Sequence, residues 1–217
     1  MKDYFPLAAG TQHIYEYSSS EFDGLARVVV IILSVKGGKK TVSVSARMRV
    51  ELKGHTSSTD YAMRKTAADM VSDDGIVVGG RIEFPLPPQK GRKWEAYPDT
   101  SEIVSLIDKI EVPAGKFKNC MKIVTLLSGG DAGSAVRYYA PGVGYVYEKY
   151  NSDDIRAEVS LVSVGKALPE DMKPSRMQPL PLPGGEEGSE DLDVNGPNWD
   201  GSPAARRKPK GKKKKSR

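Results

Sequence analysis

Few residues in this sequence have types and spacing that could support chemistry. His13 and His55 are the two histidines, and no cysteine or paired carboxylate stands near either at the short spacing of a zinc site. Two acidic pairs, Asp73-Asp74 and Asp153-Asp154, stand in turn sequences, where carboxylates usually cap backbone amides. Ser134 follows a glycine, but its surroundings are typical of a hairpin turn rather than of a nucleophile elbow. We therefore expect no catalytic residues, no metal and no cofactor.

Tyrosines form the one unusual concentration of side chains, with five of them between residues 138 and 150. Cross-strand aromatic pairs stabilise sheets, and this is the simpler interpretation of the cluster. The alternative is that one face of a hairpin lines a groove for an apolar ligand or a peptide. The candidate ligand-binding residues are Tyr138, Tyr139, Tyr145 and Tyr147.

The hairpin that carries these tyrosines turns at Pro141-Gly142-Val143-Gly144. Proline fixes its own φ and removes a donor, while glycine permits the left-handed backbone that a tight reversal requires. After the turn, strict alternation would place Tyr145 and Tyr147 on one side and Val146 and Glu148 on the other. The sequence thus predicts two antiparallel strands around a tight turn.

Most of the first 165 residues show the period-two pattern of strands. Residues 41–52 alternate most regularly, with Val42, Val44 and Ala46 on one face and Arg47 and Arg49 on the other. Residues 25–36 have an unbroken apolar centre, which predicts a strand covered on both faces. Further strands are expected at 12–18, 76–84, 117–127, 136–140, 145–150 and 155–164.

Two segments are less clear. Residues 59–71 tolerate a helix but favour a strand, while 103–112 fit helix and strand about equally well. With short turns about every ten residues, the sequence predicts an all-β fold of about ten antiparallel strands. A strongly curved sheet or barrel-like domain is the first expectation, and a two-sheet sandwich is the second.

Composition divides the chain into a domain, residues 1–165, and a tail, residues 166–217. The tail holds 12 Lys/Arg and 8 Asp/Glu and has almost no aromatic or β-branched residues, so we expect it to be disordered. Its last twelve residues contain nine basic ones, which are candidates for nonspecific binding of nucleic acid or anionic membranes. The alternative is a merely solubilising tail. The nine are Arg206, Arg207, Lys208, Lys210, Lys212, Lys213, Lys214, Lys215 and Arg217.

Four motifs occur along the chain: residues 3–7 with Gly10, Pro87 with Gly91 and Trp94, residues 112–120, and residues 138–144. In their order and spacing, they resemble the motifs of an uncharacterised bacterial domain family found in envelope proteins and lipoproteins. The resemblance implies a curved antiparallel β-domain similar to lipoprotein-carrier half-barrels, with no established activity. The lysine-rich tail is not part of the family pattern, and no lipidation cysteine is present near the start.

These observations favour a non-enzymatic domain that binds a partner protein or a small apolar ligand. The alternatives are an enzyme whose site converges from distant residues, such as two carboxylates, and a purely structural envelope-associated protein. Residues 1–6 lack the apolar stretch of a signal peptide, which predicts a cytoplasmic location. If a leader has been removed, we expect the envelope or periplasm instead. Cys120 is the lone cysteine and is expected to be buried.

Overall fold

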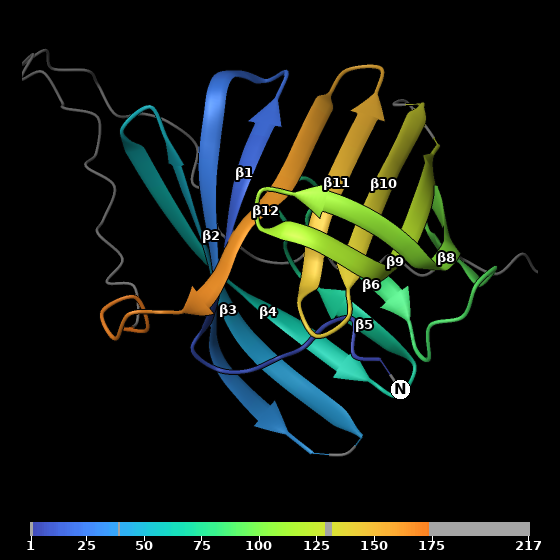
Figure 1. The fold of residues 1–217 in the computed structure, drawn as a ribbon, viewed down its shortest axis with the longest axis horizontal. Coiled ribbons are helices and arrows are strands. Elements are labelled where there is room, and N and C mark those ends of the chain that lie inside the picture. The colour runs from blue at the N-terminus through green and yellow to red at the C-terminus, as the bar shows by residue number, and fades with distance from the viewer. Residues whose placement is uncertain (1, 39, 129–131, 174–217) are drawn as a thin grey trace, which may run out of the picture. The chain divides into compact units, whose positions relative to one another are not determined.

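The computed structural model describes residues 2–38, 40–128 and 132–173, which fold into one twelve-stranded antiparallel sheet (Figure 1). The chain divides into two units, Met1–Arg176 and Met177–Arg217, and the described residues all lie in the first. The strands are β1 Thr11–Ser19, β2 Phe22–Gly37, β3 Thr41–Leu52, β4 His55–Thr66, β5 Asp69–Ser72, β6 Arg81–Pro85, β7 Lys93–Ala96, β8 Asp99–Val112, β9 Gly115–Leu127, β10 Gly133–Ala140, β11 Gly144–Ser152 and β12 Arg156–Lys166.

The sheet curls into a nearly closed barrel. Its strand order is β6-β5-β4-β3-β2-β1-β12-β11-β10-β9-β8-β7, so the pairing of β1 with β12 joins the two halves of the chain. The end strands, β6 and β7, are consecutive in sequence and meet at a seam. The predicted all-β, barrel-like architecture is therefore confirmed.

Both ambiguous segments are strands, and the sheet has two strands more than the expected ten. Residues 59–71 belong to β4 and β5, and residues 103–112 belong to β8. One extra strand arises because the first of these segments divides in two, and the other is the short edge strand β7.

The prediction of a strand over residues 76–84 was wrong in its first half, because β6 begins at Arg81. Residues 73–80 form a loop, which begins with local hydrogen bonds. The Ser72 hydroxyl donates to the Asp74 carbonyl at 2.5 Å, and the Gly75 amide donates to the Asp74 carboxylate at 2.8 Å. Ile76 and Val77 of this loop pack against the apolar core.

The hairpin of β8 and β9 bends across β10, β11 and β12 (Figure 1). The register of the two strands shifts three times between Ile103 and Lys109, and such bulges let a ladder bend. At the tip, the Ala114 amide donates to the Leu161 carbonyl at 2.9 Å. Cys120 is fully buried in this contact with Val146 and Val159, as its apolar neighbours predicted.

The first residues assigned to the tail are held against the domain. β12 runs to Lys166, and Arg47 donates to the Lys173 carbonyl at 2.7 Å. Arg49 forms an ion pair with Asp171 at 2.7 Å, and Arg47 is only 6% exposed. The boundary predicted after residue 165 is therefore too early, because two arginines of β3 hold residues 171–173. Residues 174–217 lie outside the described part of the chain.

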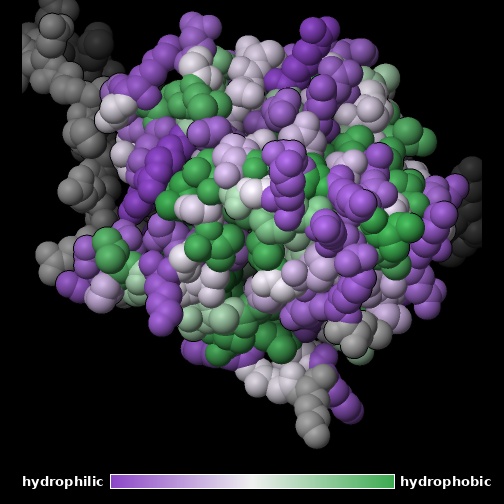
Figure 2. Space-filling view, viewed as in Figure 1, coloured by the Kyte–Doolittle hydropathy of each residue, from purple (hydrophilic) through white to green (hydrophobic). Residues whose placement is uncertain are grey.

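On the face that Figure 2 shows, small apolar groups are interspersed among hydrophilic residues. Over the whole described surface, the exposed large apolar side chains are Leu25, Tyr97, Ile107, Leu126, Val164 and Leu168. Among the described residues, no helix has the length and apolar character needed to cross a membrane.

Candidate functional site

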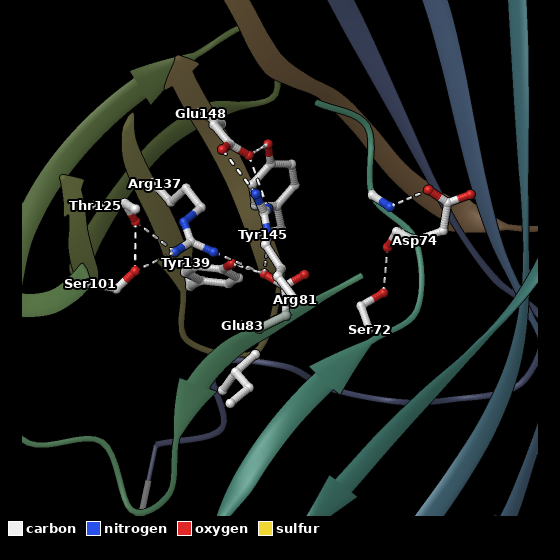
Figure 3. Close-up of polar contacts among 12 residues, drawn as sticks. Ser72, Asp74, Arg81, Glu83, Ser101, Thr125, Arg137, Tyr139, Tyr145 and Glu148 are labelled. Carbon is white, nitrogen blue, oxygen red and sulfur yellow. Dashed lines mark hydrogen bonds and ion pairs between the residues drawn. The ribbon is translucent and has the colours of Figure 1, made fainter. Parts of the chain in front are cut away.

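Two arginines and two glutamates meet inside the barrel, and we call them the buried charge cluster (Figure 3). Arg81 and Glu83 come from β6, where alternation places them on the same face. Arg137 comes from β10 and Glu148 from β11. The side chains of Arg137 and Glu148 are 3% and 1% exposed, so these charges are almost completely removed from water.

Each charge in the cluster faces an opposite one. Arg81 binds Glu148 through two parallel hydrogen bonds of 3.0 Å and contacts Glu83 at 3.1 Å. Arg137 reaches the same Glu83 oxygen at 3.4 Å. The two guanidinium groups therefore balance the two carboxylates, which buried charges require to avoid a large desolvation penalty.

Two tyrosine hydroxyls donate further hydrogen bonds to the carboxylates of the cluster. Tyr145 donates to Glu148 at 2.6 Å, and Tyr139 makes a short hydrogen bond to Glu83. Burial, together with the nearby carboxylates, raises the pKa of both tyrosines, so they stay protonated. Burial alone would raise the pKa of Glu148, but the charges of Arg81 and Arg137 and the hydrogen bonds hold it below its ordinary value.

One polar atom of Arg137 has no hydrogen-bond partner among the described residues. Its Nη2 donates to the Thr125 hydroxyl at 3.0 Å and lies 3.5 Å from the Ser101 hydroxyl, and these two hydroxyls are 2.8 Å apart. The Nε atom of Arg137 finds no acceptor among the residues that the structure describes. A buried donor without an acceptor is costly, which makes this atom notable.

A cleft of about 240 Å³ opens at the seam between β6 and β7 and reaches the buried charge cluster; we call it the seam cleft. The Trp94 indole of β7 donates to the Ile82 carbonyl of β6 at 3.3 Å, which bridges the two end strands. Trp94 is partly buried and packs against the apolar core. Among the residues that line the cleft are Ile82, Trp94, Ala96, Tyr97, Ala135 and Arg137.

A second cavity lies on the other side of Arg81 and measures only about 60 Å³. Its walls include Tyr15, Tyr61 and Tyr145, as well as Asp74 from the loop after β5. This volume corresponds to a few water molecules and is far below the roughly 300 Å³ of a typical ligand pocket. The seam cleft is therefore the better candidate for a ligand.

The Pro-Gly-Val-Gly turn is held by contacts with two other segments of the chain. The Gly142 amide donates to the Asp3 carbonyl at 2.7 Å, and the ring of His13 lies 3.0 Å from the Val143 carbonyl. Gly142 and Gly144 have φ values of 75° and 103°, as the predicted tight reversal requires. Burial lowers the pKa of His13, so the neutral ring is favoured.

The structure separates the four tyrosines predicted to line one groove. Tyr139 alternates with Arg137 on β10 and so lies near the buried charge cluster, and the register shift beside it brings Tyr145 to the same side. Tyr138 and Tyr147 instead contact each other, with ring centroids 6.0 Å apart, in the cluster that packs under the β8–β9 hairpin. The prediction that alternation opposes Tyr145 to Glu148 was wrong, because the bulge lets their side chains bond.

None of these four tyrosines lines the seam cleft, and Tyr145 alone of them lines the smaller cavity. The nine basic residues between 206 and 217 lie outside the described residues. Within the described ranges, no group of three or more His, Cys, Asp or Glu side chains could hold a metal ion.

The buried charge cluster was not predicted from the sequence. One signal was available, because Arg81 and Glu83 alternate with Ile82 and Phe84 in a strand that is otherwise apolar. Arg137 and Glu148 stand in the strongest strand pattern of the chain, yet charged residues there are usually assigned to solvent. Their meeting depends on the curvature that brings β6 close to β10 and β11.

Comparison with solved structures identifies proteins of the same fold. One is an inferred exported protein with a YmcC-like fold from Bacteroides fragilis NCTC 9343. The match has a TM-score of 0.58 and a sequence identity of 15%, and it covers 76% of this chain and 100% of the Bacteroides chain. Another is an inferred lipoprotein from Parabacteroides distasonis ATCC 8503. The match has a TM-score of 0.55 and a sequence identity of 14%, and it covers 76% of this chain and 99% of the Parabacteroides chain. No family model matches the sequence. No curated protein matches it either. At this identity, the likeness shows a shared fold and nothing more.

Proposed function

We propose that this chain is a non-enzymatic binding domain that receives a small ligand in the seam cleft. The observation that carries the proposal is the opening of the sheet at β6 and β7 onto a cleft of about 240 Å³ that is lined by Arg81, Arg137 and Glu148 of the buried charge cluster. Trp94, Ile82 and Ala135 give the cleft apolar surface beside these charged groups, and ligand sites commonly combine apolar surface with convergent polar groups. The volume suits a fragment-sized molecule rather than a lipid.

The buried charge cluster supports binding rather than proton-transfer catalysis. Two carboxylates, Glu83 and Glu148, do converge beside the cleft, as a dispersed active site would require. However, each is engaged by an arginine and a tyrosine hydroxyl, and the lowered pKa of Glu148 keeps it ionised at neutral pH. A general acid needs a raised pKa instead. The cluster is better suited to hold the cleft in one shape.

The fold neighbours support a place of action in the cell envelope. One is named as exported and the other as a lipoprotein. We propose that this chain also acts in the envelope, in place of the cytoplasmic location predicted from its first residues. Cell fractionation of the native protein tests this, since recovery in the cytosol would contradict it.

A second proposed activity belongs to the basic end of the chain. Nine Lys/Arg among residues 206–217 would attract RNA, DNA or anionic lipid by displacing counterions, without reading a sequence. This contact would add to ligand binding rather than replace it.

Native mass spectrometry of the full chain, purified without denaturation after incubation with a bacterial small-molecule extract, tests the binding proposal. Ala96→Trp should block the mouth of the seam cleft, because Ala96 is an exposed residue of β7 that lines it. Ala9→Trp is the matched control, since Ala9 is also exposed and lies outside the cleft.

We expect an added mass on the wild type and on Ala9→Trp that is reduced on Ala96→Trp. Equal occupancy in all three proteins would show that the ligand binds outside the seam cleft. A bare protein in all three would leave a structural envelope protein as the better description.

A further inference from the structure

We propose that residues 55–61 of β4, which we call the β4 edge, pair with the same residues of a second copy of this chain. The two strands would run antiparallel and join the two sheets edge to edge. This inference goes beyond ligand binding in the seam cleft and does not depend on it. Three features of the β4 edge support it: the lack of a neighbouring strand, exposure to solvent, and a sequence that fits a second copy of itself.

One side of β4 is unpaired over much of its length. On the other side, β3 pairs with β4 from His55 to Thr66, whereas β5 pairs only with residues 63–65. The Asp73 amide adds one further hydrogen bond, to the Ala62 carbonyl at 2.9 Å. Within the described part of the chain, no strand pairs with the β4 edge on the side of β5.

Alternation identifies the backbone groups that the β4 edge offers to a partner. The Ala62 carbonyl points to the side of β5, and the backbone groups of every second residue in an antiparallel strand point to the same side. Thr56, Ser58 and Asp60 therefore direct their N–H and C=O groups away from β3. All three residues are exposed. A row of such unpaired groups is a template for another strand.

The β4 edge lacks the proline, lysine and bulge that usually protect a strand edge. Residues 55–61 contain no Pro or Lys, and the pairing of β3 with β4 has no register shift. By contrast, the two strands at the seam are short, and they carry Pro85 in β6 and Lys93 in β7. The seam is thus protected against strand addition, and the β4 edge is open to it.

A second copy uses the whole β4 edge when Ser58 lies opposite Ser58 of that copy. Thr56 then faces Asp60 of the second copy and exchanges both backbone hydrogen bonds with it, while Ser57 faces Thr59. Cross-strand pairs of Ser and Thr are favourable. An unrelated peptide is a poorer fit, because strand addition gains specificity from side-chain pockets, and residues 56–59 present only small hydroxyl groups.

The charges also allow this pairing. Asp60 is the only Asp, Glu, Lys or Arg of the β4 edge, and its carboxylate pairs with Arg47 of its own chain at 2.6 Å. Because Asp60 lies opposite Thr56, the two Asp60 carboxylates do not face each other. Like charges placed directly opposite would be destabilising, and this register avoids them.

Sedimentation equilibrium of the full chain measures the association. A stable interface involves roughly 20–30 residues a side, so a pairing as short as the β4 edge should give a weak dimer, with a Kd on the order of 100 µM. We expect the mass to rise from 23.6 kDa towards twice that value as the concentration increases from about 10 µM to about 1 mM.

Ser58→Pro tests whether the backbone of the β4 edge makes the contact. The lost amide faces solvent in the single chain, a position where edge strands tolerate proline, so the fold should be kept. The dimer would lose a central donor and meet the proline ring, and we expect its Kd to rise at least about tenfold. Ser58→Ala is the matched control, since it keeps the amide and should dimerise like the wild type.

Two cysteine variants test the register and still decide if Ser58→Pro does not fold. Ser57 of one copy and Thr59 of the other form a non-hydrogen-bonded pair, whose Cα atoms lie about 4.5 Å apart, within reach of a disulfide. Under mild oxidation, a mixture of Ser57→Cys and Thr59→Cys chains should therefore crosslink. Each variant alone should crosslink far less, because identical residues are diagonal neighbours about 7–8 Å apart. Cys120 is fully buried and does not compete.

A mass of one chain at every concentration would overturn the inference. So would a dimer that Ser58→Pro leaves intact, because the two copies would then meet at another surface. Equal weakening by Ser58→Ala and Ser58→Pro would contradict backbone pairing. Equal crosslinking of the mixture and of each cysteine variant alone would contradict the register centred on Ser58.

Discussion

Removing one charge from the buried charge cluster should destabilise the domain strongly. Glu148→Gln keeps the size of the side chain but leaves Arg81 without the carboxylate that it binds at 3.0 Å through two nitrogens. Breaking a buried ion pair by removing one partner costs about 3–5 kcal/mol, because the other charge remains buried. Arg81 still contacts Glu83 at 3.1 Å, so we expect the lower end, about 3 kcal/mol.

Urea unfolding followed by circular dichroism measures this loss as a free energy of unfolding. A cost of 3 kcal/mol corresponds to a melting temperature roughly 6–12 °C lower for a domain of this size. Glu111→Gln is the matched control, because Glu111 pairs with Lys116 on the surface, where such pairs contribute about 0–1 kcal/mol.

The double variant Arg81→Met/Glu148→Leu separates a buried-charge effect from a shape effect. Replacing both partners by apolar side chains is often neutral or stabilising. Here the Tyr145 hydroxyl loses its acceptor, so we expect the double variant to be more stable than Glu148→Gln but below the wild type.

The same residue predicts a pH dependence. Because the pKa of Glu148 is lower in the folded chain, its stabilisation is fully present above the unfolded value of about 4.3 and is lost as the pH falls through the folded value. Glu148→Gln should lose less stability than the wild type in this acid range. A cost of Glu148→Gln below about 1 kcal/mol at pH 7 would refute the reasoning, because the pair would then behave like an exposed one.

The remaining predictions concern a histidine, a turn and the tail. Because burial lowers the pKa of His13, the stability contributed by its neutral ring is full above about pH 6.5 and falls at lower pH, where the unfolded chain takes up the proton first. His13→Gln should therefore flatten the dependence of stability on pH below about 6.5 in urea titrations, and an unchanged slope would contradict this. Gly37→Ala should lower the free energy of unfolding by more than about 1 kcal/mol in thermal unfolding, because Gly37 has φ 123° and an added Cβ would meet the Thr41 carbonyl. Gly38→Ala is the control: the space around Gly38 is open, so the free energy of unfolding should change by no more than about 0.5 kcal/mol. Deleting residues 174–217 should leave the melting temperature nearly unchanged and abolish a salt-sensitive affinity for RNA or anionic vesicles. Deleting residues 167–217 should lower the melting temperature, because Arg47 then loses the Lys173 carbonyl. Binding of RNA or vesicles that does not depend on salt would refute the electrostatic account.

The strands were predictable from local patterns. Alternation in residues 41–52 and the apolar centre of residues 25–36 reflect burial on one face and on two faces, and both appear as expected in β3 and β2. The turn at residues 141–144 was also predictable, because proline and glycine restrict or extend the backbone locally.

The candidate site was not predictable from the same patterns. Tyr145 faces the same side as Glu148 because of a bulge in the pairing of β10 with β11, and no local signal places this bulge. The pairing of Arg81 with Glu148 joins residues 67 positions apart and arises only when the sheet curls. Alternation placed Arg47 on the face opposite the apolar residues of its strand, but it could not predict that residues 171–173 cover this arginine.

A crystal structure of the full chain, purified without denaturation after incubation with a bacterial small-molecule extract, tests the central claim most directly. We expect ligand density in the seam cleft beside Trp94 that is absent from crystals of Ala96→Trp, with the Arg81–Glu148 pair unchanged. A seam cleft that contains only ordered water under these conditions would contradict the proposed function.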